Sequence, residues 1–134
     1  MKLPLNIVYE TTCMLLKIKT LKLGLKVDYW CNKNVRLFAD EYNFYIEQLN
    51  DIYSHYCNKD NTGQYAKLND NGGIEFNFKP DINIKDFERE MNELMYMPSD
   101  EFEPYIMNEE IFNSLPNVES SKFNIDLLAF LLPE

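Results

Sequence analysis

The sequence has little arginine, histidine and glycine, and each scarcity argues against a class of function. Arg36 and Arg89 are the two arginines and His55 is the one histidine in the 134 residues. A chain with so few arginines is poorly equipped to hold phosphates, so we expect no direct contact with nucleic acid. The four glycines lack the spacing of a phosphate-cradling loop, which argues against a nucleotide-binding site.

Cysteine is also sparse, and long apolar runs are missing. Cys13, Cys31 and Cys57 form no CxxC pair, so we expect three free thiols in a reducing compartment. No apolar stretch reaches the roughly 18 residues that a membrane span needs. The first residues also lack the features of a secretory signal. We therefore expect no membrane contact and a cytoplasmic location.

Charge is present in quantity but is divided unevenly along the chain. The net charge is −9, yet residues 1–36 carry a net charge of +5 and residues 81–110 carry −8. Such asymmetry bears on partners and association, and not on the fold. Two explanations need no partner. The two regions could pack together and neutralise each other, or they could be solvated faces of one domain spanning residues 1–134.

The clearest pattern in the sequence is a heptad-like apolar seam, which predicts a long helix after Asp28. Asp28 is the expected N-cap, and the polar run from Asn58 to Gly63 is expected to end the helix. The seam consists of Val35, Phe38, Tyr42, Tyr45, Leu49, Ile52 and Tyr56.

A hairpin and a second long helix are predicted next. Two alternating runs, Gln64–Leu68 and Ile74–Lys79, flank a turn rich in Asn and Gly. The second helix is expected to be capped by Asp81 or Asn83 and to be ended by Pro98. Its apolar spacing matches that of the first helix, which predicts an antiparallel pair of long helices with the β-hairpin at its tip.

Shorter elements complete the predicted α+β fold. A helix is expected from Thr11 or Thr12 to Thr20, and alternation then predicts a strand over Leu21–Val27. Residues 102–106 are expected to form an edge strand that pairs with Leu21–Val27 in a small edge sheet. A short helix is expected over Asn108–Leu115, and a C-terminal helix after Ser120 or Ser121 reaches residue 132.

Reactive chemistry is only weakly represented. His55 and Cys57 lie on different faces at the end of the long helix and supply at most two of four metal ligands. The loop around Asp60 resembles a calcium loop but has Asn69 where a bidentate Glu belongs. We therefore expect a protein that is not an enzyme and has no catalytic residue, metal or cofactor. A metal- or thiol-dependent enzyme using His55 and Cys57 stays as the weaker alternative.

Two surfaces are candidates for binding a protein partner. The C-terminal helix is apolar nearly all round, so it is either buried in the core or exposed to a partner or a second copy, through Leu128, Leu131 and Leu132. An acidic face is the other candidate, and the alternative is that these acidic residues only keep the protein soluble. Its residues are Asp86, Glu90, Glu93, Glu101, Glu103, Glu109 and Glu110.

The order of these features resembles a family of small uncharacterised phage and prophage proteins from phages of low-G+C Gram-positive bacteria. The resemblance rests on Leu25–Tyr29, the helix from Asn34 to Tyr56, the loop 58–63, the run Phe87–Leu94 and the closing Asp126–Phe130. The chain departs from the family in being more aromatic and in its apolar end.

What the resemblance implies is a phage source and a protein-binding role. We expect a virion or assembly component, located in the host cytoplasm or in the virion, whose partner is a phage structural protein. The alternative is an acidic anti-defence inhibitor of the anti-CRISPR kind, which would block a nucleic-acid-binding host protein. The family has no established catalytic residues, so none carry over.

Overall fold

The computed structural model describes residues 1–114 and 126–133, and it confirms the α+β class. Helices dominate, and the β1–β2 hairpin supplies the sheet within the described residues. In chain order the elements are α1 (Leu5–Thr20), α2 (Leu25–Tyr56), β1 (Ala66–Leu68), β2 (Ile74–Phe76), α3 (Ile84–Tyr96), α4 (Glu109–Ser114) and the 3₁₀ helix η2 (Asp126–Leu131).

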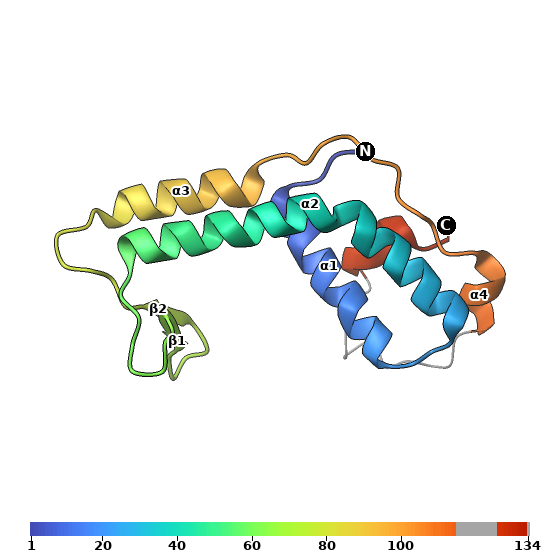
Figure 1. Ribbon diagram of the computed structural model, residues 1–134, viewed down its shortest axis with the longest axis horizontal. Coiled ribbons are helices and arrows are strands. Elements are labelled where there is room, and N and C mark those ends of the chain that lie inside the picture. The colour runs from blue at the N-terminus through green and yellow to red at the C-terminus, as the bar shows by residue number, and fades with distance from the viewer. Residues whose placement is uncertain (115–125, 134) are drawn as a thin grey trace.

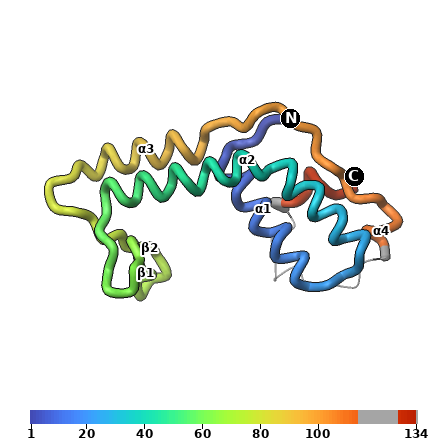
Figure 2. Tube along the Cα trace, viewed as in Figure 1, coloured from blue at the N-terminus to red at the C-terminus, as the bar shows by residue number. Residues whose placement is uncertain are grey.

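Helix α2 is the spine of an elongated molecule (Figure 1). Its first half packs against α1, and its second half runs beside α3, which points the opposite way. The hairpin lies at the far end of α2, as the tube in Figure 2 also shows. The predicted antiparallel pair with a hairpin at its tip is therefore confirmed, and α1 adds a second antiparallel partner for α2.

The predicted seam of α2 serves three apolar clusters in turn. Phe38 belongs to a core shared with α1 and η2, and Tyr45 packs with Leu5 and Leu94, where the start of α1 and the end of α3 both meet α2. Tyr56 belongs to a third cluster, built with α3 and the hairpin. A single continuous helix thus joins a head, formed with α1 and η2, to an arm, formed with α3 and the hairpin.

Helix α1 begins earlier than the sequence predicted. Pro4 occupies its N-cap position, and the helix starts at Leu5 and not after Thr11 or Thr12. Both threonines are buried on the face that meets α2, and the hydroxyl of Thr12 donates to the carbonyl of Val8 at 2.8 Å. A buried threonine can satisfy its hydroxyl within the helix in this way, so it need not mark a helix start.

The strand predicted over Leu21–Val27 is wrong. Lys22 (φ 52°) and Gly24 (φ 124°) turn the chain, and α2 begins at Leu25, so Asp28 lies in the first turn and is not the cap. The alternation required Leu25 to share one face with Val27. Instead Leu25 is 87% exposed while Val27 is buried. A tight turn between two helices mimics period-two patterning over so short a run.

The predicted partner of the edge segment is also wrong. Residues 97–102 run antiparallel to the first residues of the chain, with an isolated bridge between Pro4 and Pro98. Since Leu21–Val27 is not a strand, the acidic residues at 101 and 103 do not lie in a sheet beside its lysines. The backbone hydrogen bonds are Leu5 N to Met97 O, Ser99 N to Leu3 O and Phe102 N to Met1 O.

The hairpin and α3 follow the sequence closely. Strands β1 and β2 are shorter than predicted, with Leu68 opposite Ile74 in an antiparallel register. Of the two predicted caps of α3 the structure uses Asn83, whose side chain accepts a hydrogen bond from Lys85 N at 2.9 Å. The helix ends at Tyr96, shortly before the predicted stop.

The C-terminal part agrees with the sequence where the structure describes it. Helix α4 matches the short helix predicted over Asn108–Leu115, and η2 lies within the predicted last helix. The side chains of Leu128 and Leu131 are buried in the head, and Met107 N donates to Leu131 O at 2.9 Å. The predicted caps at 120 and 121 lie outside the described residues.

Candidate functional site

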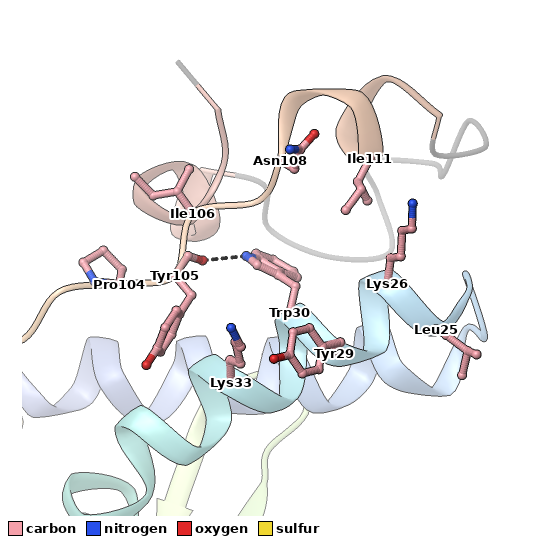
Figure 3. A pocket seen from close by; sticks show the side chains of 10 residues that line it. All are labelled: Leu25, Lys26, Tyr29, Trp30, Lys33, Pro104, Tyr105, Ile106, Asn108 and Ile111. Carbon is pink, nitrogen blue, oxygen red and sulfur yellow. Dashed lines mark hydrogen bonds between the residues drawn. The ribbon is translucent and has the colours of Figure 1, made fainter.

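A groove of about 520 Å³ lies where α2 meets the segment before α4 (Figure 3). Tyr29, Trp30 and Lys33 rise from α2 toward this segment, and Trp30, which is almost fully buried, forms the floor. The lining residues are mostly aromatic or aliphatic. They are Leu25, Lys26, Tyr29, Trp30, Lys33, Pro104, Tyr105, Ile106, Asn108 and Ile111.

One wall of the groove is fixed to α2 through the backbone of Tyr105. The side chain of Asn34 donates to Tyr105 O at 2.9 Å and accepts from Tyr105 N at 3.0 Å. Trp30 Nε1 donates to the same carbonyl at 2.7 Å, drawn as a dashed line in Figure 3. Asn34 is fully buried, so these bonds form away from water, where leaving them unmade is costly. The shape of the groove is therefore set by contacts within the chain itself.

Lysines supply the charged groups that line the groove. Lys33 Nζ lies 4.5 Å from the ring centre of Tyr29 and 5.0 Å from that of Tyr105, so cation–π attraction holds the ammonium over the groove. Lys26 lines the groove nearer its α4 end. No carboxylate is among the lining side chains, although Glu110 lines a neighbouring hollow together with Lys26.

The groove is surrounded by large apolar side chains that face solvent. Tyr29 is 62% exposed and Ile106 is 60% exposed, and Leu25 and Tyr105 add to the same surface. Single exposed apolar residues are common on soluble proteins, but a contiguous group around a preformed groove is typical of a binding site. Its aromatic composition is also that of the residues that contribute most to protein–protein affinity.

The predicted acidic face is spread along one edge of the molecule. Its residues sit on α3 and the extended segment after it, along the upper edge in Figure 1, and on α4 at the right-hand end. Some of this charge is neutralised. Arg89 pairs with Asp86 at 3.3 Å and lies 3.9 Å from Glu93, and the N-terminal ammonium pairs with Glu101.

Glu90 differs from the other predicted acidic residues because it is half-buried between α2 and α3. It lies against Tyr56, where hydrogen bonding to Glu90 raises the pKa of Tyr56 to about 12. Glu103, Glu109 and Glu110 are exposed and make no ion pair within the described residues. The open part of the acidic edge is therefore nearer to α4 than to α3.

A smaller hollow of about 240 Å³ lies below this edge, between α2 and the segment after α3. Its rim carries the carboxylates of Asp40, Glu41 and Asp100, and its apolar lining includes Phe44 and Met97. Carboxylates above an apolar floor suit the charged head and the aliphatic stem of a lysine or arginine side chain.

The predicted docking surface on the C-terminal helix is wrong for two of its three residues. Leu128 and Leu131 are buried in the head core with Phe38, and Leu132 is half-buried against the same core. The alternative left open by the sequence, a helix buried in the core, is what the structure shows. These leucines contribute to the core of the head, so the apolar side chains exposed on the described surface include those of the groove but not these leucines.

The His55 and Cys57 pair is not arranged for nucleophilic chemistry. Cys57 is buried, and burial raises the pKa of its thiol, whereas His55 is exposed with its ring against Tyr56. Burial likewise raises the pKa of Cys31 to about 12. All three cysteines are free thiols, as predicted. Over residues 1–114 and 126–133, no group of three or more His, Cys, Asp or Glu side chains is placed to hold a metal ion.

The loop that resembles a calcium site is a helix-to-hairpin connection held by its own hydrogen bonds. Asp60 accepts from Thr62 N at 2.8 Å, from Thr62 Oγ1 at 2.6 Å and from Gln64 N at 3.1 Å. These bonds, led by the Thr62 hydroxyl, lower the pKa of Asp60. Its carboxylate therefore serves the turn, as the sequence had favoured.

Sequence reasoning missed the groove because its two sides are about half the chain apart. The one signal that could have found it is Asn34, a polar residue between Cys31 and Phe38 on the buried face of the predicted helix. A buried amide requires partners, so its position predicts a polar segment packed against the helix.

The helices and the comparisons with known proteins add two findings. None of the described helices has the length and apolar character to cross a membrane. Comparison with known proteins finds no matching family model, no significantly similar curated protein and no significantly similar solved structure.

Proposed function

We propose that this chain is a non-catalytic, protein-binding protein and that the groove over Trp30 is its main contact surface. The observation that carries the proposal is the Asn34–Tyr105 pairing, which holds the wall of an apolar groove in place without a ligand. Preorganisation lowers the entropy lost on binding, so such a groove contributes more affinity than a mobile loop would.

The chemistry of the lining supports binding rather than reaction. Aromatic rings, aliphatic side chains and lysines surround Trp30. The rings of Tyr29 and Tyr105 offer large, rigid contact areas, which is why tyrosine and tryptophan are common among residues that dominate interface energies. The thiols of Cys31 and Cys57 are buried with raised pKa values, so they are poor nucleophiles.

We further propose a phage source and a role as a virion or assembly component. The resemblance to small phage proteins supports this, and the elongated helical shape with a surface groove suits a protein that joins other proteins. Self-association is part of the same proposal, with a second copy as one class of partner.

The acidic inhibitor is a second candidate, favoured by one observation. The hollow rimmed by Asp40, Glu41 and Asp100 offers carboxylates over an apolar floor, beside an edge that carries further acidic residues. A basic, nucleic-acid-binding surface of a host protein would find there both charge complementarity and a place for a basic side chain.

Affinity capture from infected cells with matched variants tests the main proposal. Ile106→Ser removes an apolar contact at the groove, and Ile74→Ser removes an equally exposed isoleucine (64% against 60%) from the hairpin at the other end. The proposal predicts that Ile106→Ser loses the captured partner and that Ile74→Ser retains it. Equal capture by wild type and Ile106→Ser contradicts the groove as the contact.

Charge reversal separates the second candidate from the first. Asp40→Lys combined with Asp100→Lys places two cations beside the acidic hollow, and neither side chain lines the groove. If the acidic edge binds the partner, this pair of changes abolishes capture and salt weakens capture by the wild type steeply. If the groove binds the partner, capture by the doubly reversed variant survives.

A further inference from the structure

We infer that the groove over Trp30 takes a short acidic peptide segment that carries a bulky apolar side chain. The inference rests on the proposed function, because it names the partner chemistry for the same groove. It goes further in assigning a class of ligand to a surface whose charge is opposite to that of the whole chain.

Charge complementarity selects the acidic part of the ligand. Lys26 and Lys33 are the charged residues that line the groove, and Lys33 is held by the two tyrosine rings with its ammonium over the opening. An ammonium in this position retains donors for a carboxylate.

The surrounding surface reinforces this selection. The last turn of α1 carries Lys17 and Lys19, and Lys22 lies in the turn that leads to α2. The α2 side of the groove is therefore rich in lysine, whereas the exposed Glu103, Glu109 and Glu110 are neighbours in the chain of the residues on its other side. A local positive potential favours approach of an acidic segment within about one Debye length, roughly 10 Å at ordinary salt.

The apolar floor selects the second part of the ligand. Trp30 lines the groove together with Tyr29 and Ile106, and the volume of about 520 Å³ falls in the range of pockets that hold compact ligands. Burying one large apolar side chain against this floor contributes more to affinity than a purely electrostatic contact at an exposed lysine does. An acidic segment without a bulky apolar residue is therefore expected to bind poorly.

Trp30 makes the test direct, because it is the one tryptophan in the sequence and forms the floor of the groove. The probe is the peptide Ac-Glu-Asp-Phe-Glu-Leu-Asp-NH2, which contains neither tryptophan nor tyrosine. Titration into the intact protein is expected to change the fluorescence of Trp30 with saturation. One control peptide replaces Phe and Leu by Ala, and the other replaces every acidic residue by Lys. Both controls are expected to bind at least about tenfold more weakly.

A matched pair of lysine variants locates the contact. Lys33→Glu reverses the charge above Tyr29 and Tyr105, and Lys59→Glu reverses a lysine that lies 5.4 Å from the ring of Tyr65 at the other end of the molecule. The inference predicts that Lys33→Glu weakens binding of the acidic peptide about tenfold or more and that Lys59→Glu leaves it unchanged. Circular dichroism of both variants checks that the fold is retained.

The outcomes distinguish the inference from the proposed function. Tighter binding of the lysine peptide, or equal loss with Lys33→Glu and Lys59→Glu, overturns the acidic ligand. If the acidic peptide causes no change at Trp30 while Ile106→Ser still loses a captured protein partner, the groove binds a protein but the ligand chemistry inferred here is wrong. If neither responds, both the inference and the proposed function fail.

Discussion

The side chain of Asn34 pairs with both backbone polar groups of Tyr105, donating to its carbonyl at 2.9 Å and accepting from its N–H at 3.0 Å. Asn34 lies on α2 and Tyr105 lies on the extended segment before α4, so one amide joins two distant parts of the chain. The fully buried amide therefore acts as a clamp that fixes the wall of the groove.

Removing the clamp is expected to destabilise the protein and open the groove. Asn34→Ala leaves the N–H of Tyr105 without its partner in a part-buried place, which costs roughly 1–3 kcal/mol. Urea unfolding followed by circular dichroism measures the loss of stability, and the fluorescence of Trp30 reports the environment of the floor.

The matched control for this change is Asn50→Ala, an exposed asparagine on the same helix. Its effect is expected to stay within about 0.5 kcal/mol of wild type, because exposed substitutions seldom do more. An equal effect of the two changes contradicts the clamp.

The buried leucines of η2 give a second prediction. Leu131→Ala removes a fully buried side chain from the head core and is expected to lower the free energy of unfolding by about 2–5 kcal/mol. Leu25→Ala, at a residue that is 87% exposed, is expected to leave it nearly unchanged. Thermal unfolding of both variants measures the difference, and a small effect of Leu131→Ala argues against its place in the core.

Most of the correct predictions came from apolar patterns that repeat over several helical turns. The seam from Val35 to Tyr56 spans three heptads, and a pattern of that length has one structural explanation. The hairpin and the Asn83 cap were predicted from turn and capping residues, whose effect on the backbone is local. Local chemistry and helical period therefore sufficed for α2, α3 and the hairpin.

Errors arose where tertiary contacts decide between local alternatives. Alternation over Leu21–Val27 fits a strand, but packing against α1 makes the same residues a turn and a helix start, with Leu25 in solvent. The groove depends on the pairing of Asn34 with Tyr105, which no local pattern encodes. Burial of Leu128 likewise depends on the position of α1, so sequence alone left both alternatives open.

The arm is expected to unfold separately from the head when its aromatic cluster is weakened. Phe87 packs against Tyr53, Tyr56 and two phenylalanines of the hairpin, and its cluster shares no buried residue with the core of the head that contains Trp30. Phe87→Ala is expected to cost about 3–5 kcal/mol in the arm. Its urea transition by circular dichroism is expected to shift more than the transition of Trp30 fluorescence. Coincident shifts of both transitions indicate one cooperative unit instead.

Stability is expected to fall in alkali. Burial raises the pKa of Cys31 from 9.0 to about 12, and burial together with Cys13 raises the pKa of Tyr9 from 10.0 to about 12. The unfolded chain loses these protons first, so the folded state binds more protons than the unfolded state in this window. The contribution is complete below about pH 9 and is lost as the pH rises toward about 12. Urea midpoints measured across this range are expected to fall steadily, and a constant midpoint contradicts the burial of these groups.

An NMR footprint of the bound partner on the labelled protein decides whether the groove over Trp30 is the contact surface. Amide signals of this chain are recorded with and without the protein that wild type captures. Binding at the groove is expected to shift most the amide signals of Tyr29, Lys33 and Ile106, while those of the hairpin residues Leu68 and Ile74 stay unchanged. Changes confined to the acidic hollow or to the hairpin, with the groove silent, would contradict it.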